Sequence, residues 1–468
     1  MKISKLLLMM AVLLCSLMII ITGCPGPSSS VSGVRTPNAI MDKSENTFVV
    51  YQVNEGNSRV TYIQRLGYYG NIVWEGKGIE LYSEPGPSEG GGVTALLVGS
   101  KYDQTIIIWE DTQGIHAQKI DLQGRFLWDV GITIPAHGAY DLKTSGDGEG
   151  GLILAWSDEN SNLYIQHIDF DGNTLWKTES PLCNTQYFNL ATDDAGNIFV
   201  VWEDKDFNIF AQKLDAAGKP AWTPGGVLLS DSHGTSDRMN SVISDGAGGI
   251  IVAWIYAIRS EDKSSITGNE LYAQRISAEG EILWETDGVL IRGMSLEPPM
   301  SVPVLPQLVS DGLGGAFVVW RSIMSIYAQR ISSAGEILWL QDGIEIWDGG
   351  NAPQSPYFAT VSDNSGDFIV VWNYIEEGKM ISDSPELRAQ RFDASGKKLW
   401  DESGIRVTED SAGYISPMLV KPDGKGGVIV SWAAGPSIHN ASASIIQRVY
   451  SSGSLLWSEN GVIFQEMM

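Results

Sequence analysis

The chain has 468 residues, with 56 acidic against 31 basic side chains and a formal net charge of −25. Such a surplus of negative charge repels phosphate backbones, so we expect no nucleic-acid partner. The three cysteines form no CxxC pair, which argues against a cysteine-based zinc or redox site.

The first 24 residues have the pattern of an export signal. Lys2 and Lys5 precede an apolar run at residues 6–21, and small residues follow it. A basic start, a short apolar core and a small-residue cleavage site are typical of a secretory signal peptide. The run is short for a membrane span, which takes about 20 apolar residues. We therefore assign residues 1–23 to a signal peptide and expect the mature chain to lie outside the cytoplasm.

The end of this signal, Ile21-Thr22-Gly23-Cys24, resembles the lipobox of bacterial lipoproteins. The resemblance implies that Cys24 carries lipid, palmitate included, becomes the mature amino terminus and anchors the chain to a membrane. Residues 24–37 then form a polar tether. The residues directly after Cys24 are not acidic, and this sorting pattern implies the outer membrane if the source has two membranes. The alternative is an ordinary signal peptide with a chance cysteine.

The remainder of the chain is built from one repeated pattern. A glutamine is followed six residues later by a glycine and ten residues later by a tryptophan, and this frame occurs eight times without a slip. Tryptophans spaced so regularly are typical of packing elements, each burying about 200 Å². We therefore interpret the frame tryptophans as structural: Trp74, Trp128, Trp176, Trp222, Trp284, Trp339, Trp400 and Trp457.

Each copy has the pattern of four short strands. In the sixth copy an extended run at residues 306–310 precedes the apolar run AFVVW at 316–320, and strands at 326–331 and from 337 onward follow, with glycine-rich turns between them. Eight such units predict an all-β, eight-bladed β-propeller with four antiparallel strands per blade over residues 38–468. A solenoid is the competing arrangement, but it needs atypical polar end copies. The first and last copies here are ordinary.

Two polar features of the repeat have a structural interpretation. Asp-x-x-Gly turns, such as Asp147/Gly150, suit a carboxylate that accepts backbone N–H groups. A calcium loop needs more carboxylates, so we expect no metal site. Each frame glutamine is followed by Lys, Arg or His. We expect the glutamine to bond to nearby backbone and the cation to pair with a turn aspartate or stack on a tryptophan; a functional basic ring is the alternative.

The Gly-x₃-Trp string at the end of each unit, as in Gly335/Trp339, resembles the tryptophan-docking repeat. That repeat occurs in quinoprotein dehydrogenases, which are eight-bladed and bind pyrroloquinoline quinone. It also occurs, without a cofactor, in the eight-bladed lipoprotein of the outer-membrane β-barrel assembly machinery. The resemblance covers almost the whole mature chain and implies the fold more than the function. Glutamine replaces the usual alanine, and the vicinal cysteine pair of many quinoprotein alcohol dehydrogenases is absent, so we expect no cofactor.

The loops expected on one face of the disc vary in length, whereas those on the other face are short and uniform. Connections from the second to the third strand, and from one blade to the next, are long around blades five to eight. Variable loops on a rigid scaffold often carry binding residues. We therefore predict a ligand- or partner-binding site there, formed by Arg259, Met294, Trp347, Tyr374, Glu376, Glu377 and His439. The alternative is that these loops are merely tolerated insertions.

No catalytic residue can be nominated from the sequence. A GxSxG string at residues 86–90 contains a proline, and the five histidines are scattered without an HExxH motif. We therefore predict a monomeric, lipid-anchored propeller that acts as a non-enzymatic binding or scaffold protein for an envelope protein or an extracellular glycan. The alternative is an enzyme that uses the central channel, either a quinoprotein-like oxidoreductase or a polysaccharide-cleaving enzyme.

Overall fold

The computed structural model describes residues 36–465, apart from 43, 56–57, 86–94, 100–102, 112, 130, 135–139, 179–181, 186, 232–240, 261–265, 294–302, 323–324, 350–356, 364, 375–385, 409–413, 416–417 and 436–442. For residues 84–85, 111, 140, 259, 266, 414–415 and 465 it describes the backbone only. The expected signal peptide, Cys24 and most of the expected tether lie outside these residues. Within them every regular element is a β-strand, so none provides a helix long and apolar enough to cross a membrane.

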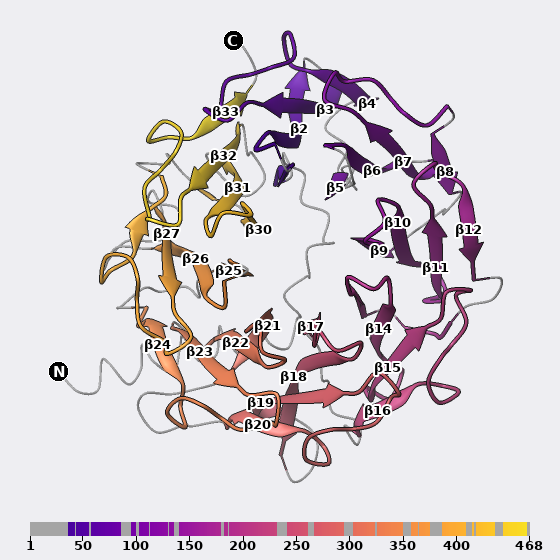
Figure 1. The fold of residues 1–468 in the computed structure, drawn as a ribbon, viewed down its shortest axis with the longest axis vertical. Helices are drawn as coiled ribbons and strands as arrows, with labels where there is room; N and C mark the ends of the chain where they lie inside the picture. Colours follow the sequence, from indigo (N-terminus) through magenta and orange to yellow (C-terminus); the bar gives the residue numbers. More distant parts are fainter. Residues whose placement is uncertain are drawn as a thin grey trace.

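The strands form eight antiparallel sheets arranged in a ring (Figure 1). The first strands of the blades, such as β9, β17 and β25, lie nearest the centre, and the last strands, such as β12, β16 and β24, lie at the rim. Each sheet is made of strands that are consecutive in the chain. The protein is therefore an eight-bladed β-propeller with four antiparallel strands per blade, as the repeat predicted.

The first four blades comprise β1 (Asn38–Met41), β2 (Thr47–Glu55), β3 (Ser58–Leu66) and β4 (Ile79–Pro85); β5 (Ala95–Gly99), β6 (Thr105–Asp111), β7 (Gly114–Ile120) and β8 (Ile132–Ile134); β9 (Tyr140–Gly146), β10 (Leu152–Ser157), β11 (Leu163–Ile168) and β12 (Thr174–Lys177); and β13 (Phe188–Thr192), β14 (Ile198–Glu203), β15 (Ile209–Leu214) and β16 (Val227–Ser230).

The last four blades comprise β17 (Ser241–Ser244), β18 (Ile250–Arg259), β19 (Ile266–Ile276) and β20 (Val289–Arg292); β21 (Val304–Ser310), β22 (Ala316–Arg321), β23 (Ile326–Ile331) and β24 (Ile344–Trp347); β25 (Phe358–Ser362), β26 (Phe368–Tyr374), β27 (Glu386–Phe392) and β28 (Ile405–Arg406); and β29 (Tyr414–Ile415), β30 (Leu419–Pro422), β31 (Val428–Gly435), β32 (Ala443–Val449) and β33 (Val462–Gln465). In the eighth blade both β29 and β30 pair with β31, so together they take the place of one inner strand.

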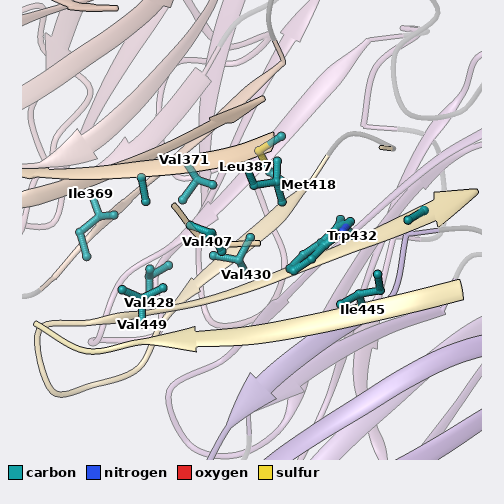
Figure 2. Packing of buried hydrophobic residues seen from close by; sticks show 12 residues of the cluster. Ile369, Val371, Leu387, Val407, Met418, Val428, Val430, Trp432, Ile445 and Val449 are labelled. Carbon is teal, nitrogen blue, oxygen red and sulfur yellow. The ribbon is translucent and has the colours of Figure 1, made fainter. Parts of the chain in front are cut away.

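Apolar side chains fill the space between neighbouring blades. In the described residues each of the eight blade interfaces holds its own cluster of buried side chains. Figure 2 shows the cluster between blades seven and eight, where Val371 and Leu387 face Val430 and Trp432. The second strand of a blade contributes to the clusters on both of its sides, which explains why its sequence is a continuous apolar run.

Each frame tryptophan packs against the frame glycine of the next blade. A methyl group on Gly280 would lie 2.7 Å from the indole ring of Trp222, and one on Gly335 would lie 2.9 Å from that of Trp284. Both glycines also have a positive φ, a backbone conformation that residues other than glycine rarely adopt. The indole N–H donates to a carbonyl of the same next blade, as from Trp222 to Ala278 at 3.0 Å. The frame spacing thus fixes how one blade joins the next.

The third blade keeps the contact of Trp176 with Gly218, but within the described residues it lacks the hydrogen bond to the next blade. Trp176 lies within β12, opposite His167 of β11, and its buried indole N–H has no hydrogen-bond partner. In the other copies a glycine follows the frame tryptophan within four residues, as Gly226 follows Trp222, but residues 177–181 contain none. Gly225 and Gly226 have φ values of 87° and 89°, a conformation that favours glycine and ends the turn after Trp222. We attribute the different course of the third blade to the absence of such a glycine after Trp176.

The frame glutamines bond to the backbone of their own blade. Gln329 accepts hydrogen bonds from the N–H groups of Arg330 and Trp339 and donates one to the carbonyl of Leu340. Six of the other seven glutamines make the same three kinds of bond, and Gln166 of the third blade instead donates to the Thr174 hydroxyl. This confirms that the glutamine serves the backbone.

The cation after each glutamine lies inside the structure, beside a turn. Arg330 pairs with Asp311 of its own blade at 2.9 Å and donates to the carbonyl of Ala394 in the next blade. Asp311 in turn accepts the N–H groups of Leu313 and Gly315, so it closes its own turn. Equivalent arginine–aspartate pairs occur in blades five, seven and eight, and in blade three the His167 ring forms a 3.0 Å hydrogen bond with Asp147. These pairs confirm the expectation for the turn aspartates in those blades.

The turn carboxylates predict loss of stability in acid. Burial opposes the ionisation of Asp169, but the backbone and side-chain N–H groups of Asn173 and the N–H of Asp171 outweigh it and lower its pKa. The pKa is likewise lowered in Asp121, Asp147, Asp158 and Asp393. A lowered folded-state pKa stabilises the fold above the unfolded-state pKa of about 3.9, and this stabilisation is lost as pH falls through the folded-state values.

We therefore expect the Tm to fall steeply below pH ~4 in a thermal-unfolding series monitored by circular dichroism. Replacing Asp121, Asp169 and Asp393 together with asparagine keeps acceptor oxygens in the turns but removes three titrating groups, so this variant should show a shallower slope. An equal slope in both proteins would contradict the assignment.

Candidate functional site

Four of the seven predicted site residues, Met294, Glu376, Glu377 and His439, lie outside the described residues. Arg259 is described in its backbone only. It is the last residue of β18 and pairs with Ile266, so it belongs to an extended hairpin rather than to the long connection expected between the second and third strands of blade five. In this hairpin residues 255–259 and 266–270 continue the antiparallel pairing of β18 with β19 beyond the length seen in most blades. Trp347 and Tyr374 are fully described.

Trp347 and Tyr374 meet between blades six and seven. Trp347 ends β24, and Tyr374 ends β26. Their ring centroids lie 5.9 Å apart with an interplanar angle of 53°, and both rings pack, half-buried, against the apolar cluster of this interface. Since both strands end on the same side of the disc, the two rings lie on the face where second strands end and first strands begin. We call this the variable-loop face, and the opposite one the uniform-turn face.

Arg388, on β27, breaks the repeat at this place. The residue across from the second-strand aromatic is a stacked or tilted ring in six blades, as with Tyr272 beside Trp254 and Tyr327 beside Trp320. In blade seven this position, opposite Trp372, is Arg388. Its guanidinium lies over the ring of Tyr374, 3.9 Å from the centroid. Blade seven therefore has a cation where six blades have an aromatic side chain, and this cation covers the ring of Tyr374.

Two guanidinium groups, those of Arg388 and Arg406, share the carboxylate of Glu386. Arg406 lies directly across from Arg388 on β28, and like charges in such a pair are destabilising. Glu386 bridges them, 3.3 Å from Arg388 and 2.8 Å from Arg406. The side chains of Glu386 and Arg388 are 22 and 21% exposed and that of Arg406 is 42% exposed. Glu386 therefore holds the two guanidinium groups side by side at the rim of blade seven.

These five residues (Trp347, Tyr374, Glu386, Arg388 and Arg406) are called the blade-seven cluster. Aromatic rings offer flat apolar surface with a polar edge, and guanidinium groups offer paired donors that match carboxylate, sulfate or phosphate oxygens. The combination suits a ligand with both C–H faces and negative charge. Among the residues that the structure describes, no group of three or more His, Cys, Asp or Glu side chains is placed to hold a metal ion.

The sequence prediction missed Glu386, Arg388 and Arg406. A signal for Arg388 was present, because it stands two residues before the frame glutamine, where six copies have Tyr, His or Phe. Glu386 resembles Glu270, which accepts a hydrogen bond from Tyr272 in blade five, so its new role follows only from the exchange at residue 388. No signal marks Arg406, because the corresponding rim position varies between copies.

Neither a protein-family model nor a curated protein sequence matches this chain. Solved structures similar to it include a eukaryotic initiation factor, with 10% identity, a TM-score of 0.46 and coverage of 92% of this chain and 89% of that chain. Sqt1 from Saccharomyces cerevisiae shares 11% identity, with a TM-score of 0.46 and coverage of 94 and 96%. An ulvan lyase shares 12% identity, with a TM-score of 0.44 and coverage of 92 and 97%. At these values the similarity says nothing about what this chain binds.

Proposed function

We propose that this protein is a lipid-anchored, extracytoplasmic binding protein whose blade-seven cluster takes an anionic glycan. The observation that carries the proposal is the exchange of a stacked aromatic residue for Arg388, which places two guanidinium groups around one carboxylate beside Trp347 and Tyr374. Six blades keep an aromatic pair at this position, whereas blade seven places Arg388 and Arg406 opposite each other, and like charges in such a pair are destabilising. Guanidinium donors match the oxygens of a ligand carboxylate or sulfate, and the rings would contact the sugar.

The anchor has its own test. The proposed lipid on Cys24 makes the expressed protein partition into the detergent phase of Triton X-114, and intact-mass analysis should show acyl chains on the amino-terminal peptide. The Cys24→Ser variant should move to the aqueous phase. Aqueous partition of the unmodified chain would overturn the anchor and leave glycan binding to be judged separately.

Glycan binding is tested on an array of anionic and neutral glycans. We expect binding to uronate- or sulfate-bearing chains, and the Arg388→Tyr variant should lower the affinity about tenfold, equivalent to ~1.4 kcal/mol. Trp347→Ala should weaken binding similarly through lost ring contact. Arg388→Tyr restores the residue of blades five and six, so its Tm should match that of the unmodified protein.

Tyr272→Phe is the matched control, because it alters the equivalent position in blade five and should leave binding unchanged. Equal binding by the Arg388→Tyr variant would overturn the site. Binding of a protein from the same envelope at the cluster, with no glycan bound, would favour the protein partner. Release of shortened oligosaccharides would favour the enzyme alternative.

A further inference from the structure

The chain enters the propeller on the variable-loop face, close to the ring axis. Thr36 and Pro37 directly precede β1, the innermost strand of blade one, and first strands begin on that face. The hydroxyl of Ser431 in blade eight donates a 2.7 Å hydrogen bond to the carbonyl of Pro37, and this bond is buried. The entry point is therefore held by two blades, on the same side of the disc as the blade-seven cluster.

The chain between Cys24 and this point is short. Twelve residue steps separate Cys24 from Thr36, so the span is at most about 40 Å when fully extended and about 20 Å on average for a random coil. A path around the rim must first cross a four-stranded blade, about 15 Å from its first to its last strand at ~4.8 Å spacing. It must then descend the length of a strand such as β2, whose nine residues span about 30 Å. The two distances together exceed the maximum extension of residues 24–36, so the tether is too short to follow this path to the uniform-turn face.

We propose that the variable-loop face is turned toward the membrane, and that the blade-seven cluster binds an anionic glycan carried by that same membrane. The inference rests on the lipid anchor and the glycan site proposed above. A route for the tether through the ring would require threading, which folded chains avoid. The uniform-turn face, with exposed turn residues such as Leu313, then points away from the bilayer.

A shared membrane would also compensate for the low affinity expected of so small a site. Five side chains provide few contacts, and association from free solution must first offset the lost translational and rotational freedom. Two partners anchored in one surface meet at a high effective concentration, which can raise the apparent affinity by 10² or more without a new contact. A cluster of this size therefore suits a ligand that is already nearby.

Orientation can be measured by energy transfer from a label on the protein to acceptors in the bilayer. The full lipidated chain is placed in phosphatidylcholine vesicles after maleimide labelling of Thr267→Cys, in the hairpin of the variable-loop face, or of Leu313→Cys. Burial raises the pKa of the Cys183 thiol to about 12, so that residue should not react at neutral pH. We expect higher transfer efficiency from residue 267, and near-equality after a long Gly/Ser insertion in the tether. Equal or reversed efficiencies without the insertion would overturn the orientation.

The ligand source is tested with the same vesicles, with and without a lipid that carries a glucuronic-acid headgroup. Membrane-bound headgroup should be engaged at roughly 100-fold lower concentration than the soluble sugar, and Arg388→Tyr should raise both concentrations about tenfold. Equal engagement of both forms would overturn the shared-membrane inference while leaving glycan binding intact. Failure of the unmodified protein to associate with any vesicle would instead count against the anchor.

Discussion

Replacing Trp222 with alanine is expected to lower the free energy of unfolding by about 3–5 kcal/mol, the usual cost of truncating a large buried aromatic side chain. Trp222 is 6% exposed, packs on Gly280 and joins the apolar cluster between blades four and five. Its indole N–H also donates to the carbonyl of Ala278. The truncation therefore opens a cavity and removes a bond between two blades, and urea unfolding followed by tryptophan fluorescence should report the loss.

Trp176→Ala is the matched control for this prediction. Trp176 holds the same place in the frame, but it is half-buried in β12 and its N–H bonds to nothing that the structure describes. Its truncation should cost clearly less than that of Trp222. Since both tryptophans contact the glycine of the next blade, equal losses at the two positions would contradict the assignment of the difference to the deeper burial and the hydrogen bond of Trp222.

Removing the carboxylate of Asp423 should cost about 3–5 kcal/mol, because it leaves a buried guanidinium without its main partner. Asp423 and Arg448 are separated by 3.1 Å, and their side chains are 0 and 1% exposed. Arg448 also contacts Glu45 of blade one at 3.1 Å, so the pair supports the junction at which the ring closes. Asp423→Ala should accordingly lower the midpoint of chemical unfolding, measured by circular dichroism.

The control for this variant is the exposed pair of Lys205 and Asp206, whose side chains are 81 and 62% exposed. Lys205→Ala should leave the midpoint unchanged, because water and salt screen such a pair. If Asp423→Ala unfolds at the same denaturant concentration as the unmodified protein, the buried pair does not support the junction.

Most of the fold was predictable because one interaction is repeated. The spacing of glutamine, glycine and tryptophan is fixed by the contact of Trp222 with Gly280 and by its seven equivalents, so the period in the sequence is the period of the blades. The third blade could not be predicted from the frame alone, since its departure depends on a glycine missing after Trp176. The extended hairpin of blade five was also missed, because polar residues interrupt its pairing pattern.

The candidate site was predictable only in part. Trp347 drew attention as the one tryptophan outside the repeated positions, and Tyr374 because a long connection follows it. The electrostatic part depends on Arg388 and Arg406 lying opposite each other and sharing Glu386. That register follows from the two-residue strand β28, which no sequence pattern marks. Contacts between rim strands of variable sequence therefore need the three-dimensional structure.

The junction between the first and last blades has a consequence for the gene. Blade one and blade eight each use only their own consecutive strands, and side chains join them, as in the 3.0 Å bond from Trp457 to the carbonyl of Tyr68. A DNA segment that encodes one whole blade thus carries both halves of the contact, a tryptophan for the next neighbour and a glycine for the previous one. Tandem duplication of such a segment yields compatible units at once, and a circularly permuted gene that starts at another blade should encode the same ring.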